Sequence, residues 1–126
     1  MKNMIKKETG LKHFFAAASY SWGGFKRLLQ EAAFRQELVF FAIALVLFVL
    51  IGATLPEFMV LVVLFLLLFA FEALNTAIEE LVDRVSPEIS NVGKHAKDLG
   101  SFAVSCAIVS CGLYIAVTLV TYLLFA

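Results

Sequence analysis

The sequence predicts an all-α membrane protein in which an N-terminal amphipathic surface helix precedes three transmembrane helices. Of its 126 residues, 62% are hydrophobic and only 16% are charged, a composition far from that of soluble domains. All Lys and Arg residues lie either before residue 36 or between residues 84 and 97. A soluble helical protein would need polar faces on its helices, and the long apolar runs have none. We therefore expect residues 1–126 to form a single membrane domain.

The segment from about residue 8 to residue 29 has one apolar and one polar side at helical spacing. The polar side carries Lys12, His13, Ser19, Lys26 and Arg27. This pattern predicts a helix lying on the membrane surface, with Tyr20 and Trp22 at headgroup level. The Gly23-Gly24 pair predicts a kink or a frayed turn. No signal-peptide cleavage pattern precedes the first apolar run, so we expect the N-terminus to be retained.

Three membrane spans are expected at about residues 31–55, 57–84 and 92–126. About 20 apolar residues are needed to cross a bilayer, and the first apolar run just meets that length before the turn at Thr54-Leu55-Pro56-Glu57. The second run, from Phe58, is long enough only if it includes polar residues. Between the second and third spans, Pro87 predicts a short helix or a tight turn.

The basic residues also predict the topology. They occur on the N-terminal segment and on the loop between the second and third spans, whereas the 52–57 turn and the C-terminus have none. Because cytoplasmic loops are enriched in Lys and Arg, we expect the N-terminus and the second loop to be cytoplasmic. The C-terminus then lies on the outer side.

A polar stripe crosses the second span between Phe71 and Asp83. At about 100° per residue, Glu72, Glu79 and Asp83 fall within roughly 40° of one another, with Asn75 flanking them. Carboxylates are costly in a bilayer and usually mark a functional site. The stripe is therefore the primary candidate for a site on this chain.

Residues of the other two spans extend this candidate site. Glu31, at the cytoplasmic start of the first span, is expected at the depth of Glu79, where two carboxylates could hold a divalent ion. Taken alone, Glu31 would pair with Arg35 one turn later. The third helix adds a face with cationic, acidic and hydroxyl groups, Lys97, Asp98 and Ser101.

This set of groups suits phosphoryl transfer to a membrane-dissolved alcohol. Mg²⁺ typically takes one or two protein carboxylates together with phosphate oxygens, so the stripe could hold a phosphate-rich ligand through the ion. A carboxylate beside the lipid, such as Glu72, could act as a general base on the alcohol.

Three motifs resemble the prokaryotic integral-membrane diacylglycerol kinase family. They are Glu-Ala-Leu-Asn-Thr-Ala-Ile-Glu-Glu-Leu-Val-Asp-Arg at 72–84, Lys-His-Ala-Lys-Asp-Leu-Gly-Ser at 94–101 and Glu-Ala-Ala-Phe-Arg-Gln-Glu at 31–37. The resemblance implies a homotrimer with active sites shared between protomers, located in the bacterial cytoplasmic (inner) membrane. It also implies that MgATP phosphorylates diacylglycerol to phosphatidate at the cytoplasmic face.

Carried over residue by residue, the resemblance assigns roles to the candidate site. Glu72 would be the base that contacts the lipid hydroxyl, and Asn75 would orient groups around the reacting phosphate. Glu31 and Glu79 would bind Mg²⁺ and the nucleotide. The remaining assignments place Asp83, Lys97, Asp98 and Tyr20 at the nucleotide, and Ser101 and His13 at the lipid.

The sequence departs from the enterobacterial pattern on the surface helix. His13, beside Lys12, stands where that form has an active-site Arg, and a neutral imidazole cannot replace a permanent guanidinium. The stretch from Trp22 to Glu31 is also one residue shorter. These departures affect the contacts of the surface helix and leave the polar stripe unchanged.

Other functions remain open at this point. Undecaprenol kinases share the motif of the second helix, although the Ala-Ala-Phe-Arg-Gln-Glu run at 32–37 favours diacylglycerol. A small proton- or ion-conducting oligomer would need acids or bases in the outer half of the spans, where Glu57 stands isolated at the turn. A purely structural subunit would leave Glu72 unexplained.

Overall fold

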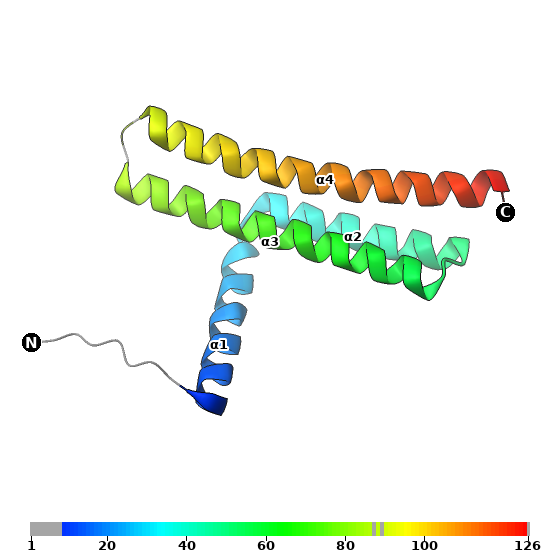
Figure 1. Ribbon diagram of the computed structural model, residues 1–126, viewed down its shortest axis with the longest axis horizontal. Helices are drawn as coiled ribbons and strands as arrows, with labels where there is room; N and C mark the ends of the chain where they lie inside the picture. The colour runs from blue at the N-terminus through cyan, green and yellow to red at the C-terminus, as the bar shows by residue number, and fades with distance from the viewer. Residues whose placement is uncertain (1–8, 87, 89, 126) are drawn as a thin grey trace, which may run out of the picture.

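The computed structural model describes residues 9–86, 88 and 90–125. Its four helices are α1 (Gly10–Leu28), α2 (Ala32–Ile51), α3 (Leu55–Val85) and α4 (Asn91–Phe125) (Figure 1). The part of the chain that is described contains no strand. Helices α2, α3 and α4 are long and apolar enough to cross a membrane. The predicted all-α membrane fold with three spans is therefore confirmed, while the turn predicted at Pro87 lies outside the described residues.

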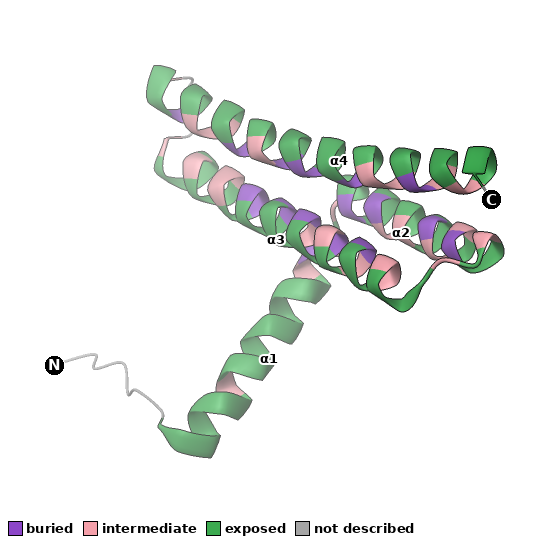
Figure 2. Ribbon diagram, turned by 45° about the vertical axis from the view of Figure 1, so that its right-hand side comes forward, coloured by how far each residue is buried: buried purple, intermediate pink, exposed green. Residues whose placement is uncertain are grey.

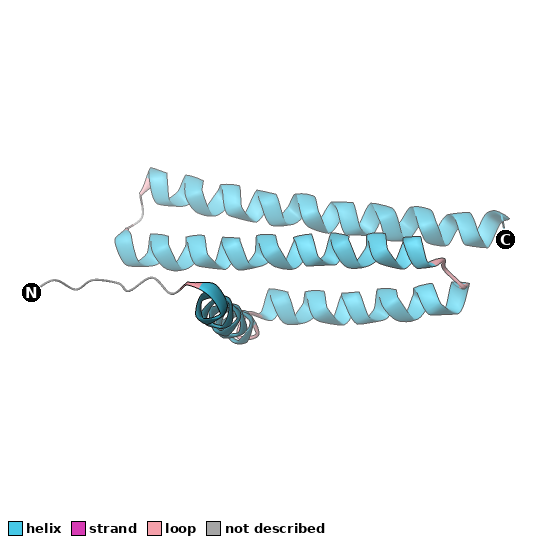
Figure 3. Ribbon diagram, turned by 60° about the horizontal axis from the view of Figure 1, so that its bottom comes forward, coloured by secondary structure: helices cyan, strands magenta, loops and turns pink. Residues whose placement is uncertain are grey.

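Helices α2, α3 and α4 lie side by side with alternating direction, and α1 projects from them at a steep angle (Figures 1 and 3). Only the C-terminal end of α1 packs closely, where Leu28 is buried. The rest of α1 is exposed apart from Ala16 and Arg27, which are partly exposed. Its location on a membrane surface stays a prediction.

The three long helices differ in length. At about 1.5 Å per residue, the 20 residues of α2 reach about 30 Å, the 31 of α3 about 46 Å and the 35 of α4 about 52 Å. The hydrocarbon core of a bilayer is about 30 Å thick. Helices α3 and α4 therefore extend past the start of α2, and this extension carries the polar residues.

Local signals begin and end these helices. Gly52 ends α2 with φ 73°, in the left-handed region that favours glycine. Helix α3 begins with a capping box in which the Thr54 backbone N–H donates to Glu57 Oε1 at 2.9 Å. The expected turn at 54–57 is thus mostly the first turn of α3. At the start of α4, the backbone N–H of Gly93 donates to the Ser90 hydroxyl at 3.0 Å.

Helix α1 continues through Gly23 and Gly24, so the predicted frayed turn is wrong. A glycine in a helix costs only about 1 kcal/mol relative to alanine. The turn that follows is held by aromatic packing, because the Phe25 ring stacks on Trp22 and meets the edge of Phe34 in α2. This packing joins the last turns of α1 to the start of α2.

Aromatic side chains join α2 to α3 in the core. Phe34 packs edge to face on Phe69 with ring centroids 5.2 Å apart, and the Phe41 and Phe65 centroids lie 4.8 Å apart. Phe48 is fully buried. Buried residues lie on the facing sides of the helices, whereas the outward sides are exposed and largely apolar (Figure 2). These outward sides suit lipid or further protein subunits.

Glu57 is held by α4 at the end of the bundle opposite α1, which corrects its description as isolated. The Tyr114 hydroxyl donates to the Glu57 carbonyl at 3.0 Å, and the Tyr122 hydroxyl donates to the Glu57 carboxylate. These tyrosines are 57 and 65 residues away in the chain. Sequence spacing could not reveal contacts that depend on how α3 and α4 pack.

Candidate active site

Helix α3 carries the predicted site residues at graded depths. From Leu55, Glu72 lies about 26 Å and Glu79 about 36 Å along the helix at 1.5 Å per residue. The hydrocarbon core is about 30 Å thick. If Leu55 lies at one membrane boundary, Glu72 falls inside the core near the other boundary and Glu79 lies beyond it. Glu72 is buried, with 5% of its surface exposed.

A second buried acid, Glu37 of α2, faces Glu72. Glu37 is 6% exposed, and its carboxyl group lies close enough to that of Glu72 for the two to interact. Among the described residues, Glu37 Oε1 has no hydrogen-bond partner. The two carboxyl groups can therefore share a proton.

The sequence interpretation did not single out Glu37, although it ends the 31–37 motif. An acid inside a membrane span is a functional candidate by default. Glu37 is the sixth residue of α2, in a helix where apolar residues follow without another charge. This signal could have identified the residue, whereas its contact with Glu72 required the packing of α2 on α3.

Asn75 links the buried part of α3 to the next candidate, Glu79. Its amide Nδ2 donates to Glu79 Oε1 at 3.1 Å. Gly100 of α4 packs directly on the Asn75 side chain: a Cβ at position 100 would lie 3.3 Å from Asn75 Cγ and closer still to Oδ1. A side chain at position 100 would therefore displace the Asn75 amide, a constraint that the sequence alone did not indicate.

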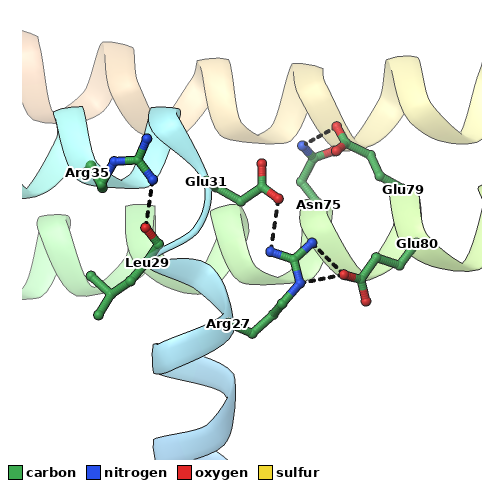
Figure 4. Close-up of polar contacts among 7 residues, drawn as sticks. All are labelled: Arg27, Leu29, Glu31, Arg35, Asn75, Glu79 and Glu80. Atoms are coloured by element: carbon green, nitrogen blue, oxygen red, sulfur yellow. Dashed lines mark hydrogen bonds and ion pairs between the residues drawn. The ribbon is translucent and has the colours of Figure 1, made fainter.

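Glu31, the residue before α2, is held by Arg27 of α1 (Figure 4). Arg27 Nη1 donates to Glu31 Oε1 at 3.0 Å, and Arg27 Nε donates to Glu80 Oε1 at 2.6 Å. The two carboxylates, first Glu31 and then Glu80, raise the pKa of Arg27 above its ordinary value. This guanidinium thus joins α1 to both α2 and α3.

The predicted pair of Glu31 and Arg35 is wrong. Arg35 Nη1 instead donates to the carbonyl of Leu29 at 2.8 Å (Figure 4). The loop between α1 and α2 brings this carbonyl and Arg27 close to the start of α2. Both arginines lie four residues from Glu31, and the turn of the chain decides which of them contacts it.

A polar cavity of about 240 Å³ lies between the ends of α3 and α4. Lys97 Nζ contacts Asp83 Oδ1 at 2.6 Å, and Lys94 Nζ contacts Asp98 Oδ2 at 2.7 Å. The side chains of both pairs are exposed by 41% or more, and exposed ion pairs contribute little free energy. Lys97 can therefore exchange its partner for a phosphate at low cost.

A second, mostly apolar cavity of about 380 Å³ lies between α2 and α4. Glu37 and Gln36 lie at its polar end, and Leu47 and Ile115 line it further along the helices. Its floor is formed by α3. The cavity therefore leads from Glu37 along the apolar part of the bundle.

The structure does not bring every predicted residue to this site. His13 and Tyr20 are exposed on α1, which points away from the bundle (Figure 1). Ser101 is exposed on α4 beside Gly100. Within one chain, Glu72, Asn75 and Glu79 follow one another along α3, and Arg27 joins Glu31 to Glu80 of the same helix. Asp83, Lys97 and Asp98 instead line the polar cavity.

The carboxylates fit a divalent ion that is shared with a substrate. Glu31 and Glu79 each have Oε1 held by a protein donor, and Oε2 of each has no hydrogen bond or ion pair to another described residue. The described residues contain no cluster of three or more possible metal ligands. Mg²⁺ commonly takes one or two carboxylates and fills its remaining positions with water and substrate phosphate.

Comparisons with known proteins agree with this arrangement. The family described as prokaryotic diacylglycerol kinase matches residues 19–120. A diacylglycerol kinase of Sinorhizobium sp is 62% identical over 112 residues, which cover 89% of this chain and 82% of the relative. That of Escherichia coli strain K12 is 37% identical over 107 residues, covering 84% and 88%.

A third relative, the diacylglycerol kinase of Pseudomonas aeruginosa, is 39% identical over 100 residues, covering 79% of this chain and 81% of the relative. The family match over residues 19–120 includes α2, α3, α4 as far as residue 120, and all the candidate residues except His13. The chain therefore belongs to the prokaryotic diacylglycerol kinase family, and the predicted function as a lipid kinase is confirmed at the level of the family.

Proposed function

We propose that this protein transfers the γ-phosphoryl group of MgATP to diacylglycerol and forms phosphatidate. The observation that carries the proposal is the buried acid pair of Glu37 and Glu72. The apolar cavity leads away from Glu37 on one side. On the other side, Glu79 lies further along α3 and Glu31 precedes α2. A lipid alcohol and a nucleotide can thus approach the pair from opposite directions.

In the proposed reaction, Glu72 accepts the proton of the lipid hydroxyl. The hydroxyl oxygen then forms a bond to the γ-phosphorus, and the bond from that phosphorus to the bridging oxygen of ADP breaks. Glu37 and the protonated Glu72 then share this proton. The apolar cavity holds an acyl chain, and Ser101 and His13 contact the lipid near its headgroup.

The nucleotide is held by the residues beyond Glu72. Glu31 and Glu79 would hold Mg²⁺, which would supply charge neutralisation on the phosphates. Asn75 orients the carboxylate of Glu79. Lys97 moves from Asp83 to a phosphate, and Asp98 and Tyr20 complete the nucleotide site.

The site also supports a homotrimer with shared active sites. Helix α1 carries His13 and Tyr20 away from the bundle of its own chain (Figure 1), so these side chains can serve a neighbouring protomer. The exposed apolar sides of the helices provide surfaces for such contacts. In the bacterial inner membrane, the basic loop and the N-terminus face the cytoplasm, which supplies MgATP.

The proposal is tested with the purified protein in mixed micelles that contain MgATP and either diacylglycerol or undecaprenol. We expect ATP consumption that depends on diacylglycerol and yields phosphatidate. A preference for undecaprenol would overturn the substrate assignment. Absence of consumption with both alcohols would overturn the kinase assignment for this chain.

A further inference from the structure

We propose that Arg27 is a positioning residue for the divalent-ion site, anchored for this task by Glu80. Its guanidinium holds the carboxylate of Glu31 so that one oxygen stays directed at the ion. The inference rests on the proposed function, because it assigns a role toward the Mg²⁺ that Glu31 and Glu79 would bind. It adds a residue of α1 to a site otherwise built from the bundle.

The contacts of Arg27 show how this works. Nη1 donates to Glu31 Oε1 at 3.0 Å, while Nε donates to Glu80 Oε1 at 2.6 Å (Figure 4). A planar guanidinium that is bound at two places cannot rotate freely. Because Glu80 belongs to the rigid helix α3, the orientation of Arg27 is set by the same helix that carries Glu79.

Glu31 needs such support because of its place in the chain. It precedes α2 with extended backbone angles, φ −85° and ψ 126°, and its side chain makes no capping hydrogen bond. Its side chain is 35% exposed. Without Arg27, the carboxylate would be free to sample several rotamers, so binding an ion would cost more conformational entropy.

Glu79 has a matching arrangement within α3. Asn75 Nδ2 holds Glu79 Oε1 at 3.1 Å (Figure 4), as Arg27 holds Glu31 Oε1. Each candidate ligand therefore has one oxygen fixed by a donor from the protein. Hydrogen bonds of this kind to metal-binding carboxylates orient them and increase metal affinity.

Because Arg27 is positively charged, the direction of the change in ion affinity on its removal tests the proposal. A cation close to Mg²⁺ repels it, so removal of Arg27 would tighten ion binding if repulsion dominated. If orientation of Glu31 dominates, removal of Arg27 weakens ion binding despite the lost repulsion. The two effects predict opposite changes in the same measurement.

The experiment measures the binding of Mn²⁺, in place of Mg²⁺, to the full chain in micelles with a non-hydrolysable ATP analogue. Free Mn²⁺ is followed by electron paramagnetic resonance. We expect Arg27→Gln to weaken Mn²⁺ binding by about tenfold, the lower end of the effect of removing such support. Arg27→Lys, which keeps the charge but cannot bridge two carboxylates in the same way, should recover only part of this loss.

Lys26→Gln is the matched control, because Lys26 is an exposed neighbouring cation on α1 with no ion pair to another described residue. We expect it to leave Mn²⁺ affinity unchanged. A double-mutant cycle then isolates Glu80: Glu80→Gln should weaken binding in the wild type and have no further effect beside Arg27→Gln. If Glu80→Gln weakens Mn²⁺ binding equally in the wild type and in the Arg27→Gln variant, Glu80 does not act by anchoring Arg27.

The outcomes separate this inference from the proposed function. If the wild-type protein binds Mn²⁺ and Arg27→Gln binds it equally well or more tightly, only the positioning role is overturned. Failure of the wild-type protein to bind Mn²⁺ with the analogue would overturn the metal site itself. If Arg27→Gln does not fold, Arg27→Lys and Glu80→Gln must still show weaker binding, and unchanged affinity in both would overturn the proposal.

Discussion

At the scale of single residues, the buried acids carry the proposed reaction. Glu72 and Glu37 meet in an apolar environment where a carboxyl group has few other partners. Further along α3, the carboxylates are exposed enough to meet a nucleotide. The two groups of acids therefore suit different partners, a lipid alcohol and a metal-bound phosphate.

Glu37→Gln tests whether the second buried acid contributes to the reaction. We expect kcat to fall by about tenfold or more, with an unchanged KM for MgATP, because proton-transfer groups typically contribute about 10²–10⁴-fold. Glu72→Gln should cause a larger loss of kcat, again with nucleotide binding retained. Steady-state kinetics in mixed micelles provide both values.

Ser105→Ala is a control on α4, because its hydroxyl donates to the Ser101 carbonyl of the same helix. It should leave kcat unchanged. If Glu37→Gln gives wild-type kcat, Glu37 has no part in proton transfer. If it instead raises the KM for MgATP with kcat intact, the acid serves the nucleotide.

At the scale of elements, the antiparallel pair of α3 and α4 positions the site through close contacts along its length. Gly100 allows α4 to approach Asn75, and at the other end Tyr114 and Tyr122 bind Glu57. The first contact lies beside the candidate site and the second is far from it. Their substitution should therefore separate effects on activity from effects on stability.

Gly100→Ala should lower both stability and kcat, because the added methyl group collides with the Asn75 amide that holds Glu79. Overpacking of this kind typically costs about 1–3 kcal/mol. Thermal unfolding in detergent and kinetic assays check the two effects. Gly112→Ala on the same helix is the control for stability, since a Cβ there meets no neighbouring atom within 4 Å; an equal loss of stability in both variants would contradict the steric explanation.

Tyr122→Phe should destabilise the bundle while leaving kcat unchanged. It removes the hydrogen bond from α4 to the Glu57 carboxylate, worth about 1 kcal/mol at a partly exposed position. Chemical or thermal unfolding in micelles measures the loss. Ser110→Ala, which removes a hydroxyl bound only to the Cys106 carbonyl of its own helix, should have little effect, and a similar loss there would argue against a link between α3 and α4.

At the scale of the whole molecule, the candidate residues of one chain lie in separate places. Helix α1 projects from the bundle with His13 and Tyr20 exposed (Figure 1). Along α3, Asp83, which holds Lys97, lies about 16 Å beyond Glu72 at 1.5 Å per residue. A shared site between protomers would bring groups together that are separated in one chain.

Co-assembly of Glu72→Gln and Lys97→Gln chains tests this arrangement. If each site takes Glu72 and Lys97 from different protomers of a cyclic trimer, a 1:1 random mixture should recover about a quarter of wild-type activity. Each variant alone serves as the inactive reference. Lack of recovery in proven mixed trimers would show that both residues act from the same chain.

Much of this protein follows from local sequence patterns. Long apolar runs determined the three membrane-spanning helices, because a helix is the simplest way to satisfy backbone groups in lipid. Helical periodicity placed Glu72, Glu79 and Asp83 on one side of α3, and the three motifs identified the family. These features depend on neighbours within a few turns of one helix, which the sequence displays directly.

The tertiary structure decided the contacts between helices. The pair of Glu37 with Glu72, the packing of Gly100 on Asn75 and the tyrosines on Glu57 all join residues from different helices. Because of the turn before α2, Glu31 pairs with Arg27 and not with Arg35. Such contacts depend on the rotation and relative depth of packed helices, which composition and periodicity within a single helix do not determine.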